Sequence, residues 1–182
     1  MGKTYDRIDA DLEAWLWCQK VFFVATAPLS PDGHINCSPK GGDTFRVVGP
    51  REVAYLDLTG SGIETIAHAR ENGRIVVMFC AFNGAPQIVR LHGVAQVLYA
   101  GDLDFERLEA LFPRHPGTRA VVKIAVSRIS DSCGYAVPRF DFVQQRDVLD
   151  KWTSRKTAEE LSTYRAAKNS KSIDGLPGHK PE

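Results

Sequence analysis

The stretch RIVVMFCAFNGAPQIVRLHGVAQVLY, residues 74–99, decides the fold that this sequence predicts. Two β-rich runs, Arg74–Phe82 and Gln87–Tyr99, flank the turn signal Asn83-Gly84-Ala85-Pro86. This is the pattern of two strands joined by a short loop. The second run is also long enough to bend around a barrel. The stretch therefore predicts the centre of an antiparallel sheet.

Further short strands are predicted on both sides of this pair. The turn signal Ser30-Pro31-Asp32-Gly33 joins two of them into a hairpin, and Gly49-Pro50-Arg51 joins two more. The additional strands are Val21–Ala27, His34–Ser38, Phe45–Val48, Glu52–Asp57 and Ala120–Ile129.

Helices are predicted singly between these strands. They are Asp9–Lys20, Ser61 to about Arg70, and Asp102–Phe112, the last with Leu103, Leu108 and Leu111 facing inward. Because helices and strands do not alternate one by one, the order argues against a Rossmann sheet. It favours a mainly β (α+β) fold, a closed or nearly closed antiparallel barrel with helices at its ends.

The composition changes at about Gln144. Asp147–Ala167 is predicted to be a polar helix, and the glycine- and proline-containing segment Ser170–Glu182 a solvated tail. We therefore expect a barrel domain over residues 1–143 and a helical extension with its tail over residues 144–182.

Composition and charge exclude several classes of function. The chain has 182 residues, 43% of them hydrophobic and 25% charged, which is typical of a globular domain. Its formal net charge of +1 gives no general attraction to nucleic acid or to an anionic membrane. The apolar runs are too short to span a bilayer and no signal peptide is evident, so a cytoplasmic protein is expected.

The four cysteines, Cys18, Cys37, Cys80 and Cys133, are far apart and form no Cys-x-x-Cys pair. No local zinc or redox dithiol site follows, and no metal site is expected. We expect buried or half-buried free thiols. Cys133 lies in a loop beside a glycine and a proline, where a reactive thiol and a small residue packed in a tight turn are both consistent with the sequence.

The segment from Asp57 to Thr65, DLTGSGIET, is a strand that runs into a glycine-rich turn and then a helix. Free amide groups at a helix start, with hydroxyls on Thr59, Ser61 and Thr65, suit a phosphate group. An alternative is that Ser61 and Glu64 form a capping box, which explains both residues without a ligand. Neither hypothesis is excluded by the sequence.

A bound phosphate also requires cationic side chains. Lys40 follows the second strand of the first hairpin, and Arg90 interrupts an otherwise apolar strand. Arg90 either faces solvent or points into a ligand cleft. No Gly-x-Ser-x-Gly, His-Glu-x-x-His or P-loop motif is present, and the five histidines are scattered singly.

Four segments together resemble the FMN-binding split-barrel family related to pyridoxamine 5′-phosphate oxidase, over roughly residues 10–130. They are NCSPKGGD at 36–43, DLTGSG at 57–62, ENGRIVVMF at 71–79 and QIVRLHG at 87–93. The CGYAVP segment at 133–138 and the SIDGLP segment at 172–177 are similar to those of one branch of that superfamily. The order and spacing of the segments carry the resemblance.

The resemblance implies an antiparallel split β-barrel, with flanking helices and a C-terminal helix, that binds FMN at the interface of a homodimer. It assigns the phosphate to Lys40, Thr59, Ser61, Thr65 and Arg90, with Gly62 in the same turn. Ser38 and Gln87 are placed to reach the flavin ring or ribityl chain, and Cys133 and Tyr135 are candidates for the substrate side of the ring.

Two departures from the oxidase matter. The oxidase's C-terminal substrate-binding segment is missing, which argues against oxidation of pyridoxamine phosphate. A basic pair that follows the turn in the oxidase is also missing, and Glu64 lies where one of those cations is expected. One phosphate contact is therefore absent or replaced.

The resemblance favours an FMN-dependent oxidoreductase that moves hydride or electrons between a reduced nicotinamide or deazaflavin and an unknown small-molecule acceptor. The alternative is a non-enzymatic flavin-binding module for storage, sensing or assembly. A third hypothesis is a thiol enzyme that uses Cys133.

Overall fold

The predicted strands assemble into one antiparallel sheet in the computed structural model, which describes residues 2–179. Eight strands lie within this range. They are β1 (Thr4–Tyr5), β2 (Val21–Thr26), β3 (Asn36–Gly41), β4 (Phe45–Gly49), β5 (Glu52–Leu58), β6 (Arg74–Cys80), β7 (Ile88–Leu98) and β8 (Thr118–Ser132).

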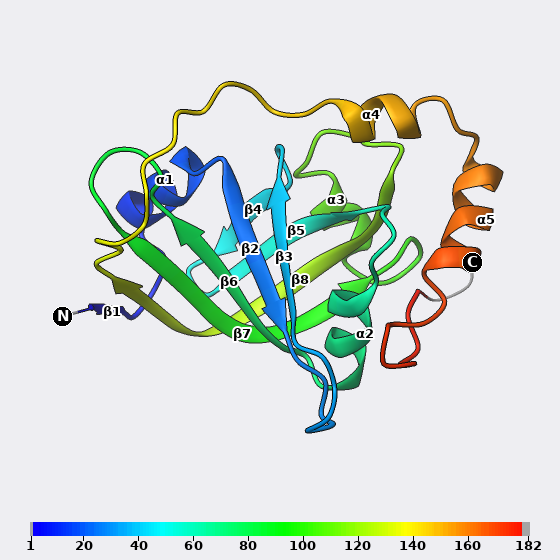
Figure 1. Cartoon of the computed structure of the whole chain (residues 1–182), viewed down its shortest axis with the longest axis horizontal. Coiled ribbons are helices and arrows are strands. Elements are labelled where there is room, and N and C mark those ends of the chain that lie inside the picture. The colour runs from blue at the N-terminus through cyan, green and yellow to red at the C-terminus, as the bar shows by residue number, and fades with distance from the viewer. Residues whose placement is uncertain (1, 180–182) are drawn as a thin grey trace.

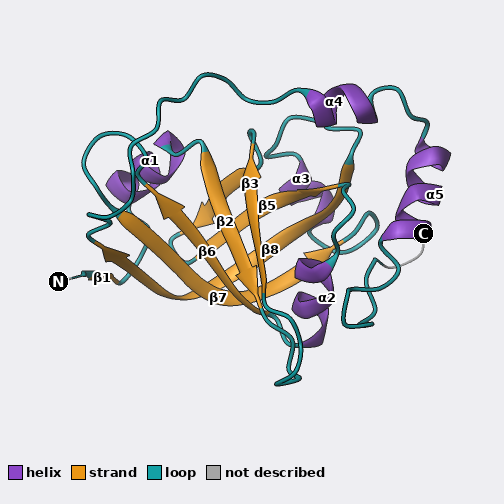
Figure 2. Cartoon of the chain, viewed as in Figure 1, coloured by secondary structure: helices purple, strands orange, loops and turns teal. Residues whose placement is uncertain are grey.

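The sheet is curled, and its two ends do not meet. The strand order is β3-β2-β6-β7-β8-β5-β4, with β1 added beside β8. Every pairing is antiparallel, and β3 and β4 remain edge strands of the path. The curled sheet occupies the middle of the molecule, with the helices around its rim (Figure 2). The predicted split β-barrel is confirmed.

The inner face of the sheet forms the core, because successive side chains of a strand point to opposite faces and the inward set is apolar. Val24, Val77, Leu91 and Ile129 are fully buried on neighbouring strands. The outer face of β2, β6 and β7 is also partly apolar. Phe23 pairs with Met78, and Met78 with Arg90, so these three half-buried residues form one row across that face.

Two of the predicted helices are shorter than expected. α1 (Ala10–Cys18) begins where the Asp9 side chain accepts from the Leu12 amide at 2.9 Å. α3 covers only Phe105–Glu109, because Asp104 has a positive φ of 73° and interrupts the run. The inward prediction for Leu103 and Leu111 is wrong: they are 91% and 44% exposed, while Leu108 is buried.

The helix after the glycine-rich turn also differs from the prediction. α2 spans Glu64–Glu71, not Ser61 to Arg70, and Ile63 occupies its N-cap without a side-chain hydrogen bond. The capping-box hypothesis is wrong, since the Glu64 carboxylate accepts from the Ile63 amide rather than from Ser61.

The C-terminal extension divides into two helices. Residues 133–147 cross the top of the sheet without regular structure and lead into α4 (Val148–Thr153) and α5 (Ala158–Lys168) (Figure 1). The predicted continuous helix breaks where Thr157 starts α5 with a capping box to Glu160. In the described part of the tail, Ser172 and Gly178 are buried while Lys171, Ile173, Gly175 and Pro177 are exposed, so the predicted solvated tail packs on the protein in part; residues 180–182 lie outside the described range.

The cysteine prediction needs a correction. Cys80 is buried, but Cys18, Cys37 and Cys133 are exposed free thiols. Within residues 2–179, no helix has the length and apolar character needed to cross a bilayer.

Gly93 lies where β7 bulges against β8, and replacing it with alanine is expected to destabilise the protein. An alanine Cβ would lie 2.2 Å from the Ala125 carbonyl oxygen, which is backbone and cannot rotate away. We expect Gly93→Ala to lower the free energy of unfolding by about 1–3 kcal/mol in urea denaturation. Gly49→Ala is the matched control in β4, since the nearest atom to its new Cβ lies 3.9 Å away. Equal stability of the two variants would contradict the prediction.

Candidate functional site

The glycine-rich turn between β5 and α2 forms one wall of an open cleft, here called the turn cleft. Its volume is about 470 Å³. The opposite wall is the start of β3, and the C-terminal tail closes one side. The lining residues are His34, Ile35, Asn36, Cys37, Ser61, Gly62, Glu64 and Ile173.

The amide groups of this turn are available to a ligand. Among residues 2–179, the amides of Gly60, Ser61 and Gly62 donate no hydrogen bond, and Ser61 is exposed. Unengaged consecutive backbone N–H groups before a helix favour an anion. The turn therefore presents donors of the kind that the phosphate hypothesis requires.

Two carboxylates lie at the cleft: Glu64 lines it, and Asp174 follows the lining residue Ile173. Both accept hydrogen bonds from N–H groups of the protein. Glu64 accepts from the amides of Ile63 and Ile173 at 3.0 and 3.3 Å. Asp174 accepts from the His34 amide at 2.8 Å and from its Nδ1 at 2.6 Å. These hydrogen bonds hold the pKa of Asp174 below its ordinary value. The carboxylates thus fix the tail and the loop before β3 to the turn.

Three polar residues of β3 share the inner face of the sheet. Asn36, Ser38 and Lys40 pair with the buried Thr26, Val24 and Phe22 of β2. Asn36 donates to Thr65 at 2.9 Å, and Ser38 donates to Asn36 at 2.8 Å. The structure therefore links the predicted residues Ser38 and Thr65 through Asn36, which the sequence reasoning missed.

Lys40 lies beside a buried ion pair that the sequence did not indicate. Asp57 is fully buried and accepts from Arg119 at 2.7 Å, while Lys40 Nζ is more distant, at 3.4 Å. Burial alone raises the pKa of Asp57, but Arg119 and Lys40 more than offset this, so its pKa is held below the ordinary value. Since Arg119 already neutralises Asp57, the charge of Lys40 remains available to an anion.

Thr59 belongs to a buried network that supports the turn. Its hydroxyl donates to Gly117 O at 2.9 Å and accepts from Arg165 Nε at 3.0 Å. Asn169 accepts from Arg119 and donates to Gly60 O at 2.9 Å. The extension therefore holds the turn in place, and the Thr59 hydroxyl proton is already engaged.

The remaining predicted residues lie at another part of the sheet. Arg90 is on the outer face of β7 and donates to Ser132 at 2.9 Å. Gln87 precedes β7, and the Gly134 backbone packs against it, which places the exposed Cys133 and Tyr135 next to Gln87. No hydrogen bond or ion pair between described residues joins this group to Lys40 or to the turn.

The candidate residues thus form two groups. The first group is Ser38, Lys40, Thr59, Ser61, Gly62 and Thr65; the second is Gln87, Arg90, Cys133 and Tyr135. Of the first group, Ser61 and Gly62 line the turn cleft, while Ser38 and Lys40 lie further along β3. Unengaged amides and the Ser61 hydroxyl are donors that fit a phosphate, and Lys40 is the cation on the adjoining strand.

Comparisons with known proteins establish the family of the chain. The family model described as pyridoxamine 5′-phosphate oxidase matches residues 8–133. The chain belongs to the pyridoxamine 5′-phosphate oxidase family. It is also 39% identical over 195 residues to the pyridoxamine 5′-phosphate oxidase family protein ustO of Aspergillus flavus, an alignment that covers 96% of this chain and 76% of ustO.

Solved structures share the fold of this family member. HupZ of Group A Streptococcus is 22% identical, with a TM-score of 0.51, over 67% of this chain and 91% of HupZ. A Clostridium acetobutylicum protein related to general stress protein 26 is 13% identical, with a TM-score of 0.52, over 68% of this chain and 86% of its own. Members of the family often bind a flavin and are often dimeric.

Proposed function

We propose that this chain binds FMN and acts as an oxidoreductase between a reduced nicotinamide or deazaflavin and a small-molecule acceptor. The observation that carries the proposal is the set of unengaged amides in the turn that lines the turn cleft, in a chain of a family that often binds flavin. When bound, the flavin would supply the hydride or electron chemistry.

The residues of the turn would hold the phosphate. The amides of Gly60–Gly62 and the Ser61 hydroxyl offer hydrogen bonds, Thr65 is fixed beside them by Asn36, and Lys40 offers a positive charge. Ser38 lies between Asn36 and Lys40 on the same face of β3, where it would contact the rest of the cofactor. The buried network around Thr59 would keep the turn in its binding conformation.

We propose that a homodimer completes the site. Lys40 lies on the inner face of the sheet and Arg90 on the outer face, so one copy does not direct both at the same ligand. The half-buried row of Phe23, Met78 and Arg90 suits packing against a second copy, which would bring its Gln87 and Arg90 to the flavin. Cys133 and Tyr135, beside Gln87, would then line the substrate side.

The proposal includes a cytoplasmic location. Three of the four cysteines are exposed, and all four are free thiols, which suits a reducing compartment.

The visible spectrum of the purified protein and its titration with FMN test cofactor binding. We expect flavin absorbance after reconstitution and bleaching on anaerobic mixing with NADH, NADPH or a reduced deazaflavin. Flavin that stays oxidised with every donor would assign the non-enzymatic binding module instead. A colourless protein that does not bind added FMN would contradict both flavin functions. Loss of activity but not of FMN binding in Cys133→Ala would support the thiol enzyme.

A further inference from the structure

A second cavity, here called the aromatic pocket, lies at the other end of β3. β3 begins at Asn36 in the turn cleft and ends at Gly41, next to Gly42 and Asp43 of the pocket. The pocket has a volume of about 310 Å³, enough for a ligand with one ring. No predicted cofactor residue lines it.

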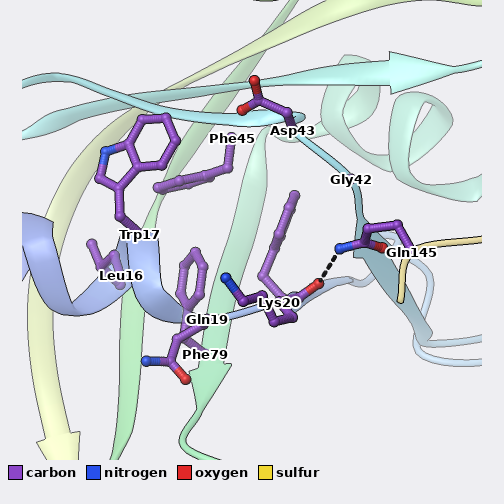
Figure 3. Close-up of a pocket in the computed structure, with 10 residues that line it drawn as sticks. Leu16, Trp17, Gln19, Lys20, Gly42, Asp43, Phe45, Phe79 and Gln145 are labelled. Atoms are coloured by element: carbon purple, nitrogen blue, oxygen red, sulfur yellow. Dashed lines mark hydrogen bonds between the residues drawn. The ribbon is translucent and has the colours of Figure 1, made fainter. Parts of the chain in front are cut away.

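Aromatic side chains form the apolar side of this pocket. Phe22, Phe45 and Phe79 pack against one another with ring centroids 4.9 to 5.5 Å apart. Trp17 stands beside Phe45 and is 48% exposed, so much of its surface has no cover (Figure 3). A rigid aromatic wall of this kind favours a planar apolar ligand.

The charges around the pocket do not cancel. Asp43 is held in a two-point contact with Arg46 Nη1 and Nη2 at 2.5 and 3.0 Å, and Arg46 in turn lies 4.8 Å above the Trp17 ring. Lys20 lines the same pocket and forms no ion pair with any carboxylate of residues 2–179. Arg46 does not line the pocket but neutralises Asp43, so Lys20 is the lining charge left without a carboxylate partner among the described residues. Its Nζ lies 5.7 Å from the centroid of the Phe142 ring. This arrangement favours an anionic ligand.

A residue of the C-terminal extension closes the polar side. Gln145 reaches across the space and donates to the Lys20 carbonyl oxygen at 3.2 Å (Figure 3). Its Oε1 also lies close to Gly41. The extension therefore fixes the backbone of Lys20 at the edge of the pocket.

We propose that the aromatic pocket binds a small aromatic carboxylate, with its ring against Trp17 and Phe45 and its carboxylate at Lys20. This ligand class combines the two features that the lining offers, an aromatic wall and one uncompensated cation. Binding at this pocket does not require a flavin, so its test is separate from the test of cofactor binding.

Calorimetric titration of the flavin-free full-length protein with 3-phenylpropionate tests the proposal, with 3-phenylpropanamide as the uncharged probe of the same shape. We expect the acid to bind about fivefold or more tightly than the amide. Lys20→Gln should lower the affinity for the acid by a similar factor and leave the affinity for the amide unchanged, since only the charge contact is lost. Trp17→Leu should lower the affinity for both probes, because the aromatic wall is lost.

Matched controls are available elsewhere in the chain. Lys156 also lies over an aromatic ring, at 5.1 Å from the centroid of Trp152, so Lys156→Gln and Trp152→Leu should leave both titrations unchanged. The melting temperature of each variant shows whether it is folded. The proposal would be overturned if the wild type bound the acid and the amide equally or bound neither probe. It would also be overturned if folded Lys20→Gln and Trp17→Leu bound both probes with the affinities of the wild type.

Discussion

Asp57→Asn is expected to lower the free energy of unfolding by about 3–5 kcal/mol, because it breaks a buried ion pair and leaves Arg119 without its carboxylate. The Asp57 and Arg119 side chains are 1% and 4% exposed, so water cannot replace the lost contact. For a chain of this size the melting temperature should fall by about 10 °C. Urea denaturation and thermal melting measure the effect.

The control for Asp57→Asn is Asp147→Asn. Asp147 pairs with Lys151 on an exposed helix surface, where a salt bridge contributes little to stability. The melting temperature of Asp147→Asn should stay within about 1 °C of that of the wild type. If Asp57→Asn behaves like this control, the buried pair does not stabilise the fold as described.

The pH dependence of stability follows from the same pair. The folded-state pKa of Asp57 is depressed, so its contribution is present above the unfolded-state pKa and is lost as the pH falls through the folded-state pKa. Between about pH 7 and acidic pH, the wild type should therefore lose more stability than Asp57→Asn. Parallel pH curves would contradict this.

Lys40→Ala and Arg90→Ala are each expected to weaken FMN binding by about 10- to 100-fold, or about 1.5–3 kcal/mol, through loss of one charge-assisted contact to the phosphate. Binding of riboflavin, which lacks the phosphate, should change much less. Fluorescence titration with both ligands measures the difference. Lys151→Ala, an exposed lysine on α4, is the control and should not affect either ligand. Unchanged FMN affinity in both variants would mean that the phosphate binds elsewhere.

Mixing the two variants tests the homodimer. If each site takes Lys40 from one subunit and Arg90 from the other, a mixed dimer of Lys40→Ala and Arg90→Ala contains one intact site. Refolding the variants together should then restore tight FMN binding to a fraction of the sites. No recovery in a mixture shown to exchange subunits would place both cations in the same subunit's site.

The sequence determined the strands more reliably than the helices. The β-rich runs of β6 and β7 and the turn signal between them were sufficient to predict the centre of the sheet, because strand propensity and turn residues are local properties of the sequence. Helix ends were less predictable. Asp104 takes a left-handed conformation that its residue type does not require, and Glu64 caps its neighbour instead of Ser61.

The candidate site was predicted in part, for the same reason. The glycine-rich turn is a local feature, so Ser61 and Gly62 could be identified as cleft residues. Arg119, Asn169 and Asp174 could not, because each acts on a residue at least 50 positions away in the sequence. The roles of Asn169 and Asp174 depend on the extension folding back onto the barrel, and that of Arg119 on the pairing of β8 with β5. Only the SIDGLP segment, which contains Asp174, gave a signal that this tail matters.

The sequence by itself determined the class of the fold, its family resemblance and the turn where an anion would bind, since these depend on neighbouring residues and their order. The tertiary structure alone decided which cations remain available. Arg119 and Lys40 both face the single carboxylate of Asp57, which leaves one positive charge in excess, and Arg90 faces the opposite side of the sheet. Ion pairing and the face of a curled sheet depend on distances between strands that are far apart in the chain, and no local pattern encodes them.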